Sequence, residues 1–315
     1  MKFWLVFIAI ILQAQNLYDI YRFEGKNALI THIESKLQSP SYWLQRLKDK
    51  NLTYGYYQNE KNILVCNKSL KNLKIYDSKN LRLIDKIDVL TGLKGDKEKE
   101  GDLKTPIGVY RLVSLLKEVD EYYGPFAFET SYPNYYDRIH GKSGYGIWIH
   151  GYPLNGLRES NITKGCIVLK NSNLERLKNE IDYKKSYLLI SDSKPLTTDA
   201  EEIANILAFI YRWREAWQKS DFKRYKTFYS KDFVRLSQTR KEFFNTKQKI
   251  FDIRKNQNVE ILFSDINIIP YQNIENKKIF RIDMKEKYKA DGYEYNGTKE
   301  LYISYGNPIL IILEK

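Results

Sequence analysis

Histidine and cysteine are scarce in this sequence. Its 315 residues include three histidines and two cysteines, and no spacing of His, Cys, Asp or Glu matches a structural or catalytic zinc site. We therefore expect no metal and no other cofactor. The scarcity makes one pair informative, because His150 and Cys166 lie sixteen positions apart in one loop-like segment and each adjoins a glycine.

The apolar run at the start of the chain is short. It extends from Phe3 to Leu12 and is followed by Gln13-Ala14-Gln15, so it is too short to cross a membrane and remain there. This pattern predicts a signal peptide over residues 1–14 with cleavage after Ala14. An uncleaved N-terminal anchor is the alternative. We expect an exported chain with no stable membrane span once the signal is removed.

Acidic residues are outnumbered by basic ones. The sequence has 39 Asp and Glu against 52 Lys and Arg, which gives a formal net charge of +13 and a pI near 9.3. The basic residues are spread along the chain, whereas nucleic-acid-binding proteins usually gather them in a stripe. We therefore expect no nucleic-acid partner. For an exported protein, this charge favours attraction to an anionic cell-wall polymer.

The residues around His150 and Cys166 suit nucleophilic chemistry. A thiol needs a base to become a thiolate at neutral pH, and a nearby imidazole supplies one. Gly165 permits backbone conformations that other residues avoid, so that neighbouring amides can turn toward a developing oxyanion. The apolar runs 146–149 and 167–169 predict short strands joined by a polar loop over 152–164. A structural histidine and a buried, inert cysteine are the alternative.

Three ordered blocks resemble the signature of the L,D-transpeptidase (YkuD-type) catalytic domain, in which HG is followed by [ST]-x-G-C-[IV]. One block here consists of His150-Gly151 and the run from Thr163 to Ile167. The second is residues 101–110, which resemble the GDxxTPxGxY segment of the family, and the third is Tyr132-Pro133-Asn134, upstream of the histidine. The resemblance implies that Cys166 is the nucleophile, His150 the base, and the backbone near Gly165 the oxyanion site.

The chain departs from this signature at two positions. Many members have a second histidine before the GC pair and an arginine two places after the cysteine, where this chain has Lys164 and Val168. The departures indicate the YafK-like branch and leave open how a substrate carboxylate is held. We expect Arg158 or Lys164 to meet that carboxylate, unless both are solvated loop charges. His140 and Tyr132 are further candidates for substrate binding, although His140 is equally well read as an ordinary loop histidine.

The family resemblance also implies the substrate. Members act on peptidoglycan stem peptides at the bond between the L-centre of the diamino acid and the terminal D-alanine. Water as the acceptor gives a trimmed tripeptide, and an amine acceptor gives a 3-3 crosslink. Such a substrate places the protein in the periplasm.

The patterns along the chain predict three regions after the signal peptide. Residues 15–53 have helical spacing, and this segment needs a partner, either the catalytic domain or a second copy in a homodimer. Residues 54–192 are rich in strand patterns and contain the motifs. Residues 193–315 run from helices to antiparallel strands, and the stretch from Trp213 to Phe233 resembles the opening of an NTF2-like domain.

The predicted fold class is therefore α+β multidomain, with a mainly β catalytic domain between the helical segment and an α+β NTF2-like domain. This arrangement resembles the shape-determining L,D-carboxypeptidases of helical epsilonproteobacteria. We predict a carboxypeptidase that affects cell shape, with an L,D-transpeptidase as one alternative. A catalytically inactive wall-binding scaffold is the other, and the presence of both His150 and Cys166 counts against it. Cys66 is predicted to be a small hydrophobic residue of a strand, because a disulfide with Cys166 would remove the nucleophile.

Overall fold

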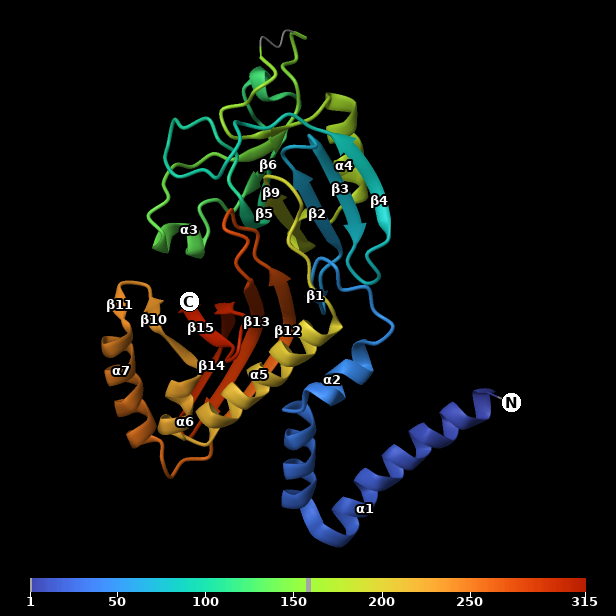
Figure 1. Ribbon diagram of the computed structural model, residues 1–315, viewed down its shortest axis with the longest axis vertical. Coiled ribbons are helices and arrows are strands. Elements are labelled where there is room, and N and C mark those ends of the chain that lie inside the picture. The colour runs from blue at the N-terminus through green and yellow to red at the C-terminus, as the bar shows by residue number, and fades with distance from the viewer. Residues whose placement is uncertain (1, 157–159) are drawn as a thin grey trace. The chain divides into compact units, whose positions relative to one another are not determined.

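The structure is a computed structural model that describes residues 2–156 and 160–315, with side chains from residue 17 onward (Figure 1). The chain forms two compact units, residues 1–49 with 200–215, and residues 50–199 with 216–315. None of the described helices is both long and apolar enough to span a membrane.

The first unit is helical. It contains α1 (Lys2–Leu37), α2 (Pro40–Leu47) and most of α5 (Ala200–Gln218). Gly25 interrupts α1 with a φ of 83°, and Pro40 begins α2, where its fixed φ suits the first helical turn. The Trp43 ring stacks on Tyr211 at 5.5 Å, so α2 has an aromatic partner on α5.

The second unit contains an eight-stranded sheet that carries the catalytic motifs. Its order is β4-β3-β2-β9-β5-β6-β7-β8. The strands are β2 (Asn62–Asn67), β3 (Asn72–Asp77), β4 (Leu83–Asp88), β5 (Gly108–Leu116), β6 (Ala127–Thr130), β7 (Trp148–His150), β8 (Ile167–Val168) and β9 (Ser186–Ser191). The helical elements between them are η1 (Glu121–Tyr123), α3 (Tyr135–Ile139), α4 (Asn171–Glu180) and η2 (Tyr183–Lys185).

Apolar side chains spaced along α4 fix this helix on the sheet. Leu174 and Leu177 are fully buried in the same cluster as Leu64 and Cys66 of β2. Each leucine contributes about 2 kcal/mol through burial. Cys66 has a free thiol whose pKa burial raises to about 12, which agrees with its predicted place as a small hydrophobic residue of a strand.

The second unit also contains a seven-stranded sheet, with the order β1-β12-β13-β14-β15-β10-β11. The strands are β1 (Tyr56–Tyr57), β10 (Tyr229–Arg235), β11 (Gln238–Thr239), β12 (Glu260–Pro270), β13 (Ile279–Ala290), β14 (Tyr293–Ser304) and β15 (Leu310–Glu314), with helices α6 (Phe222–Thr227) and α7 (Arg240–Ile253). The sequence patterns predicted the long strands but not α7, which begins with a capping box between Thr239 and Glu242. The predicted α+β fold class is confirmed.

The two sheets of the second unit share a core. Val65, Val109 and Leu189 of the first sheet belong to the same buried cluster as Ile269 and Tyr302 of the second. A polar network of four contacts lies beside this cluster. Arg111 pairs with Glu60 and donates to the Tyr187 hydroxyl, Tyr187 donates to Asp283, and Arg281 donates to the Val109 carbonyl. Buried apolar and paired charged groups thus fix the catalytic sheet against the C-terminal sheet.

Candidate active site

Cys166 and His150 line one groove of 440 Å³ in the catalytic sheet region. β7 ends at His150 and β8 begins at Ile167, and the two strands pair in parallel with His150 opposite Val168. The Leu169 amide donates to the His150 carbonyl at 3.0 Å. Strand pairing therefore brings the histidine and the cysteine to the same edge of the sheet, although sixteen positions separate them.

A backbone carbonyl orients the His150 ring. Its Nδ1 lies 2.8 Å from the carbonyl oxygen of Gly151, and because a carbonyl can only accept, Nδ1 carries the proton. Nε2 is then the basic nitrogen of the neutral ring. A Cβ at Gly151 would lie 2.1 Å from Asn171 Oδ1, so a larger residue there would displace the Asn171 side chain. The ring is buried and meets Tyr123 edge-on at 5.0 Å.

The turn that presents Cys166 is held by Thr163. Its Oγ1 accepts from the Gly165 amide at 3.1 Å and donates to the Cys166 carbonyl at 2.7 Å. Gly165 has a φ of +127°, and a Cβ there would lie 2.8 Å from Ile147 Cδ1 and 2.9 Å from a backbone oxygen. Threonine and glycine are thus both needed for the turn. The half-buried Cys166 thiol donates to the Gly146 carbonyl at 3.4 Å.

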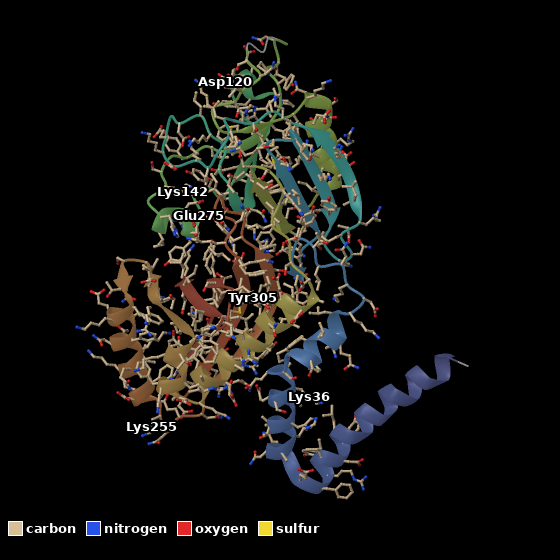
Figure 2. All side chains as sticks on the ribbon, viewed as in Figure 1. Lys36, Asp120, Lys142, Lys255, Glu275 and Tyr305 are labelled. Carbon is tan, nitrogen blue, oxygen red and sulfur yellow. The ribbon has the colours of Figure 1, made fainter. Side chains whose placement is uncertain are left out.

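An aromatic wall bounds one part of the groove. Tyr122 and Tyr123 come from η1, whose first turn is capped by Asp120 accepting from the Tyr122 amide (Figure 2). The Tyr123 ring also meets Trp148 at 4.9 Å. Burial, and then the negative charge of a nearby Cys166 thiolate, raises the pKa of Tyr123. The phenol therefore stays protonated at neutral pH and is a hydrogen-bond donor close to the sulfur.

A charged loop over residues 94–104 bounds another part. Lys97 is buried and pairs with Asp102 at 2.8 Å, and Asp102 also accepts from the amides of Glu98, Lys99 and Lys104. Burial alone would raise the pKa of Asp102, but these donors outweigh it and hold that pKa well below its usual value. The loop is thereby fixed in one conformation.

A second ion pair ties the loop to its neighbour. Asp96 pairs with Lys142, labelled in Figure 2, which also pairs with the buried Asp137 at 3.1 Å. Asp137 in turn is part of the capping box of α3 with Asn134. The groove wall is therefore anchored in the body of the domain at two points.

The structure brings together some of the predicted site residues and not others. Lys164 lines the groove with Cys166 and His150, and Gly165 lies in the turn between Lys164 and Cys166. Tyr132 is buried, donates to the Ser143 carbonyl and is not one of the residues that line the groove. His140 is exposed, stacks on Tyr136 at 4.0 Å and does not line the groove either. Arg158 lies outside the described residues.

Three contributors were not predicted from the sequence. The Gly151 carbonyl and the Thr163 hydroxyl act through local geometry, for which the HG and T-x-G-C motifs were the only sequence signal. Tyr123 belongs to an aromatic-rich segment that gave no reason to single it out. Within the described parts of the chain, no group of three or more His, Cys, Asp or Glu residues could hold a metal ion.

Comparison with known families gives one match over the eight-stranded sheet and another over most of the seven-stranded sheet. Residues 61–190 match the YkuD family, the L,D-transpeptidase catalytic domain, and residues 205–315 match the Cds6 C-terminal NTF2-like domain. The Escherichia coli K12 protein named "Putative L,D-transpeptidase YafK" is 32% identical over 93 residues, which are 29% of this chain. The chain spans about a third of the length of this relative, 34%.

Solved structures extend the similarity to nearly the whole chain. The helical cell shape determining protein Pgp2 of Campylobacter jejuni is 39% identical, with a TM-score of 0.82 over 88% of this chain and 99% of that one. A point mutant of the same Campylobacter protein gives 38% identity and a TM-score of 0.83. Bd1075 of Bdellovibrio bacteriovorus shares the fold at 22% identity, with a TM-score of 0.67 over 84% of this chain and 97% of that one. With this identity over almost all of Pgp2, the chain belongs to the Pgp2-like family, which joins a YkuD-type L,D-transpeptidase catalytic domain to an NTF2-like C-terminal domain.

Proposed function

We propose that this protein is a peptidoglycan L,D-carboxypeptidase that trims stem tetrapeptides to tripeptides and thereby affects cell shape. The observation that carries the proposal is the shared groove, in which His150 has its Nδ1 proton committed to the Gly151 carbonyl and Cys166 stands at a glycine turn. This arrangement leaves Nε2 as the basic nitrogen of a ring that lines the same groove as the thiol, and acyl transfer by cysteine requires such a base. Similarity to a helical cell shape determining protein supports the same role.

The proposed reaction has two stages. His150 Nε2 takes the thiol proton, and the Cys166 sulfur attacks the carbonyl carbon of the diamino acid. The bond to D-alanine then breaks, with the proton delivered from His150 to the leaving amine. In the second stage His150 takes a proton from water, whose oxygen attacks the thioester carbonyl. The C–S bond then breaks to release the tripeptide, and His150 returns the proton to the Cys166 sulfur. The developing oxyanion is held by amides near Gly165, each worth roughly 3 kcal/mol in the transition state.

The Gly165 amide has an acceptor within its own turn. It donates to Thr163 Oγ1, so an oxyanion must compete with a neutral hydroxyl for this donor. A charged acceptor makes the stronger hydrogen bond. The Thr163 hydroxyl therefore holds the turn that carries Gly165 and Cys166.

Lys164 is proposed to bind a substrate carboxylate. Arg158 is proposed for the same role because it precedes the same turn in sequence. Tyr132 and His140 do not line the groove, so any effect of theirs on substrate binding would act through the segments that they support. No cofactor is required by the proposed chemistry.

The remaining proposals concern the whole chain. We propose that residues 1–14 direct export to the periplasm, that residues 15–53 form a helical segment able to pair two copies, and that 54–192 and 193–315 are the catalytic and NTF2-like domains. An L,D-transpeptidase is the second candidate function, because an amine could replace water at the thioester. An inactive wall-binding scaffold is the third.

The test is to incubate the purified protein with disaccharide tetrapeptide in a buffer containing EDTA and to identify the products by mass. We expect tripeptide and free D-alanine with little crosslinked dimer. Dimer as the main product would replace the carboxypeptidase by the transpeptidase. Absence of turnover, with the Cys166 thiol titrated as reduced, would support the scaffold.

A further inference from the structure

Two charges of opposite sign line the groove without partners in the described structure. Glu100 and Lys164 both border the groove that holds Cys166 and His150, and both are exposed. Among the residues that the structure describes, neither side chain forms an ion pair or a hydrogen bond, whereas the third charged side chain of the wall, Lys97, is paired with Asp102. Glu100 and Lys164 are therefore available to a ligand.

The Glu100 backbone is fixed on both sides. Its predecessor Lys99 donates its amide to Asp102 at 3.1 Å and gives its carbonyl to Lys97 Nζ at 3.0 Å. Asp102, two positions after Glu100, accepts from the Lys104 amide at 3.1 Å. A charge on a preorganised loop loses little entropy when it binds, so more of the interaction remains for the ligand.

The close approach of a second loop keeps Glu100 at the groove. A Cβ on Gly144 would lie 3.3 Å from Lys97 Cε and 3.5 Å from Glu100 Cα, so the two segments are already in contact through the glycine. The Ser143 amide donates to the Glu98 carbonyl at 2.9 Å, which joins them. The carboxylate at position 100 therefore belongs to a rigid wall, while Lys164 adjoins the turn of the nucleophile.

We propose that Glu100 binds the ammonium group and Lys164 the carboxylate of the free amino-acid end of the diamino acid side chain. The groove then selects stem peptides whose third residue ends in an uncrosslinked zwitterion. Two opposite charges that line one groove complement the two charges of a zwitterion, since each ligand charge then meets a partner of opposite sign. This inference rests on the proposed function, since the zwitterion is part of the proposed stem-peptide substrate.

The pairing carries a consequence for selectivity. A side chain whose amine is already in an amide crosslink has no ammonium group, so it leaves the Glu100 carboxylate without its partner. A site built to pair a charge discriminates against ligands that lack it more strongly than an apolar site does. We therefore expect the enzyme to act on uncrosslinked stems.

The test compares kcat/KM for D-alanine release from three tetrapeptides. They carry diaminopimelate, diaminopimelate with its side-chain amine acetylated, or lysine, which keeps the ammonium and lacks the carboxylate. The unaltered protein should prefer the free amine to the acetylated one by about tenfold. Glu100→Gln should reduce that preference to about one, and Lys164→Met should remove the preference for diaminopimelate over lysine.

Glu98→Gln is the matched control, because its side chain is exposed in the same loop and does not line the groove. It should keep both preferences. If Glu100→Gln retains the preference for the free amine, acetylation acts through bulk alone and the inference is overturned. If the unaltered protein releases no D-alanine from any of the three peptides, the proposed function itself fails.

Discussion

The catalytic groove and the cavity of the C-terminal domain differ in whether their charged side chains have partners of opposite sign. In the 590 Å³ C-terminal cavity, the buried Lys299 pairs with Glu286 at 3.3 Å and with Glu314 at 3.0 Å. In the groove, Glu100 and Lys164 are exposed and unpaired within the described residues. A buried charge destabilises the fold unless it is paired with a charge of opposite sign. An exposed charge is solvated and can remain unpaired until a ligand binds. Changes in the groove should therefore alter activity, and changes at Glu314 should alter stability.

Removal of the reactive groups is the largest expected effect on the groove side. Cys166→Ala and His150→Ala should each abolish D-alanine release, by roughly 10³-fold or more, because neither group works without the other. Circular dichroism and urea unfolding should remain close to those of the unaltered protein. Cys66→Ser is the control, since this buried thiol lies in the core and the variant should keep its activity. Full activity in a folded Cys166→Ala protein would end the assignment of the nucleophile.

A methyl group on Gly165 should damage the site while sparing the fold. The Cβ would lie 2.8 Å from Ile147 Cδ1 and 2.9 Å from the Lys104 carbonyl oxygen, so the Cys166 turn must move. We expect Gly165→Ala to lower kcat by about 10²-fold, since a small displacement of the reacting groups is costly. Gly141→Ala shares the positive φ and has nothing within 4 Å of its Cβ, so its kcat should change little. Equal loss in both variants would point to backbone strain alone.

Glu314 tests the other side of the comparison. Burial would raise its pKa, but Lys299, Lys247 and the Tyr229 hydrogen bond lower it from 4.5 to about 2. Because the folded-state pKa is depressed, the stabilisation is present above pH 4.5 and is lost as the pH falls toward 2. The shift corresponds to about 3 kcal/mol in the free energy of unfolding.

Urea unfolding between pH 6 and pH 3 measures this contribution. Glu314→Gln should be less stable than the unaltered protein at pH 6, and the difference should shrink as the pH falls. A difference that does not depend on pH would mean that Glu314 acts through packing and not through its charge.

The smallest expected effect is that of the loop cations. The Arg158→Ala, Lys164→Ala double variant should lose about tenfold in kcat/KM, which is the worth of one charged hydrogen bond to a carboxylate. Most of the loss should appear in KM, because a carboxylate remote from the scissile bond is bound in the ground state as well. Unchanged kinetics would show that both are solvated loop charges.

The sequence predicted those parts of the molecule that depend on local pattern. The strands around Ile63 and Ile75 follow from β-branched residues between turns, and the groove follows from the HG and T-x-G-C motifs. The carbonyl that orients His150 could not be predicted, because a backbone group leaves no trace in residue type. The Lys97–Asp102 ion pair could not be predicted either, because it lies in a run of charged residues and the sequence does not indicate which of them pair. α7 did carry a signal, the Thr239 and Glu242 capping box, in an otherwise polar stretch.

The two-residue strand β1 gives no periodic signal at all. Tyr56 and Tyr57 lie within the range expected to form the catalytic domain, yet they pair with Ile268 and Asn267 of β12. The Gln58 side chain extends the contact, accepting from the Ile266 amide at 2.8 Å.

This strand limits how modular the protein can be. β1 precedes β2 in the chain but forms the edge of the C-terminal sheet. A cut in the connection over 192–199 would therefore give two pieces that still pair through β1 and β12. Exchange of either half between homologues by recombination at that connection would separate β1 from the sheet it completes. In such chimaeras β12 would have to pair with a β1 from another protein, and a poor match would expose a sheet edge to pairing with other chains. The pairing of β1 with β12 therefore favours inheritance of the two halves as one unit.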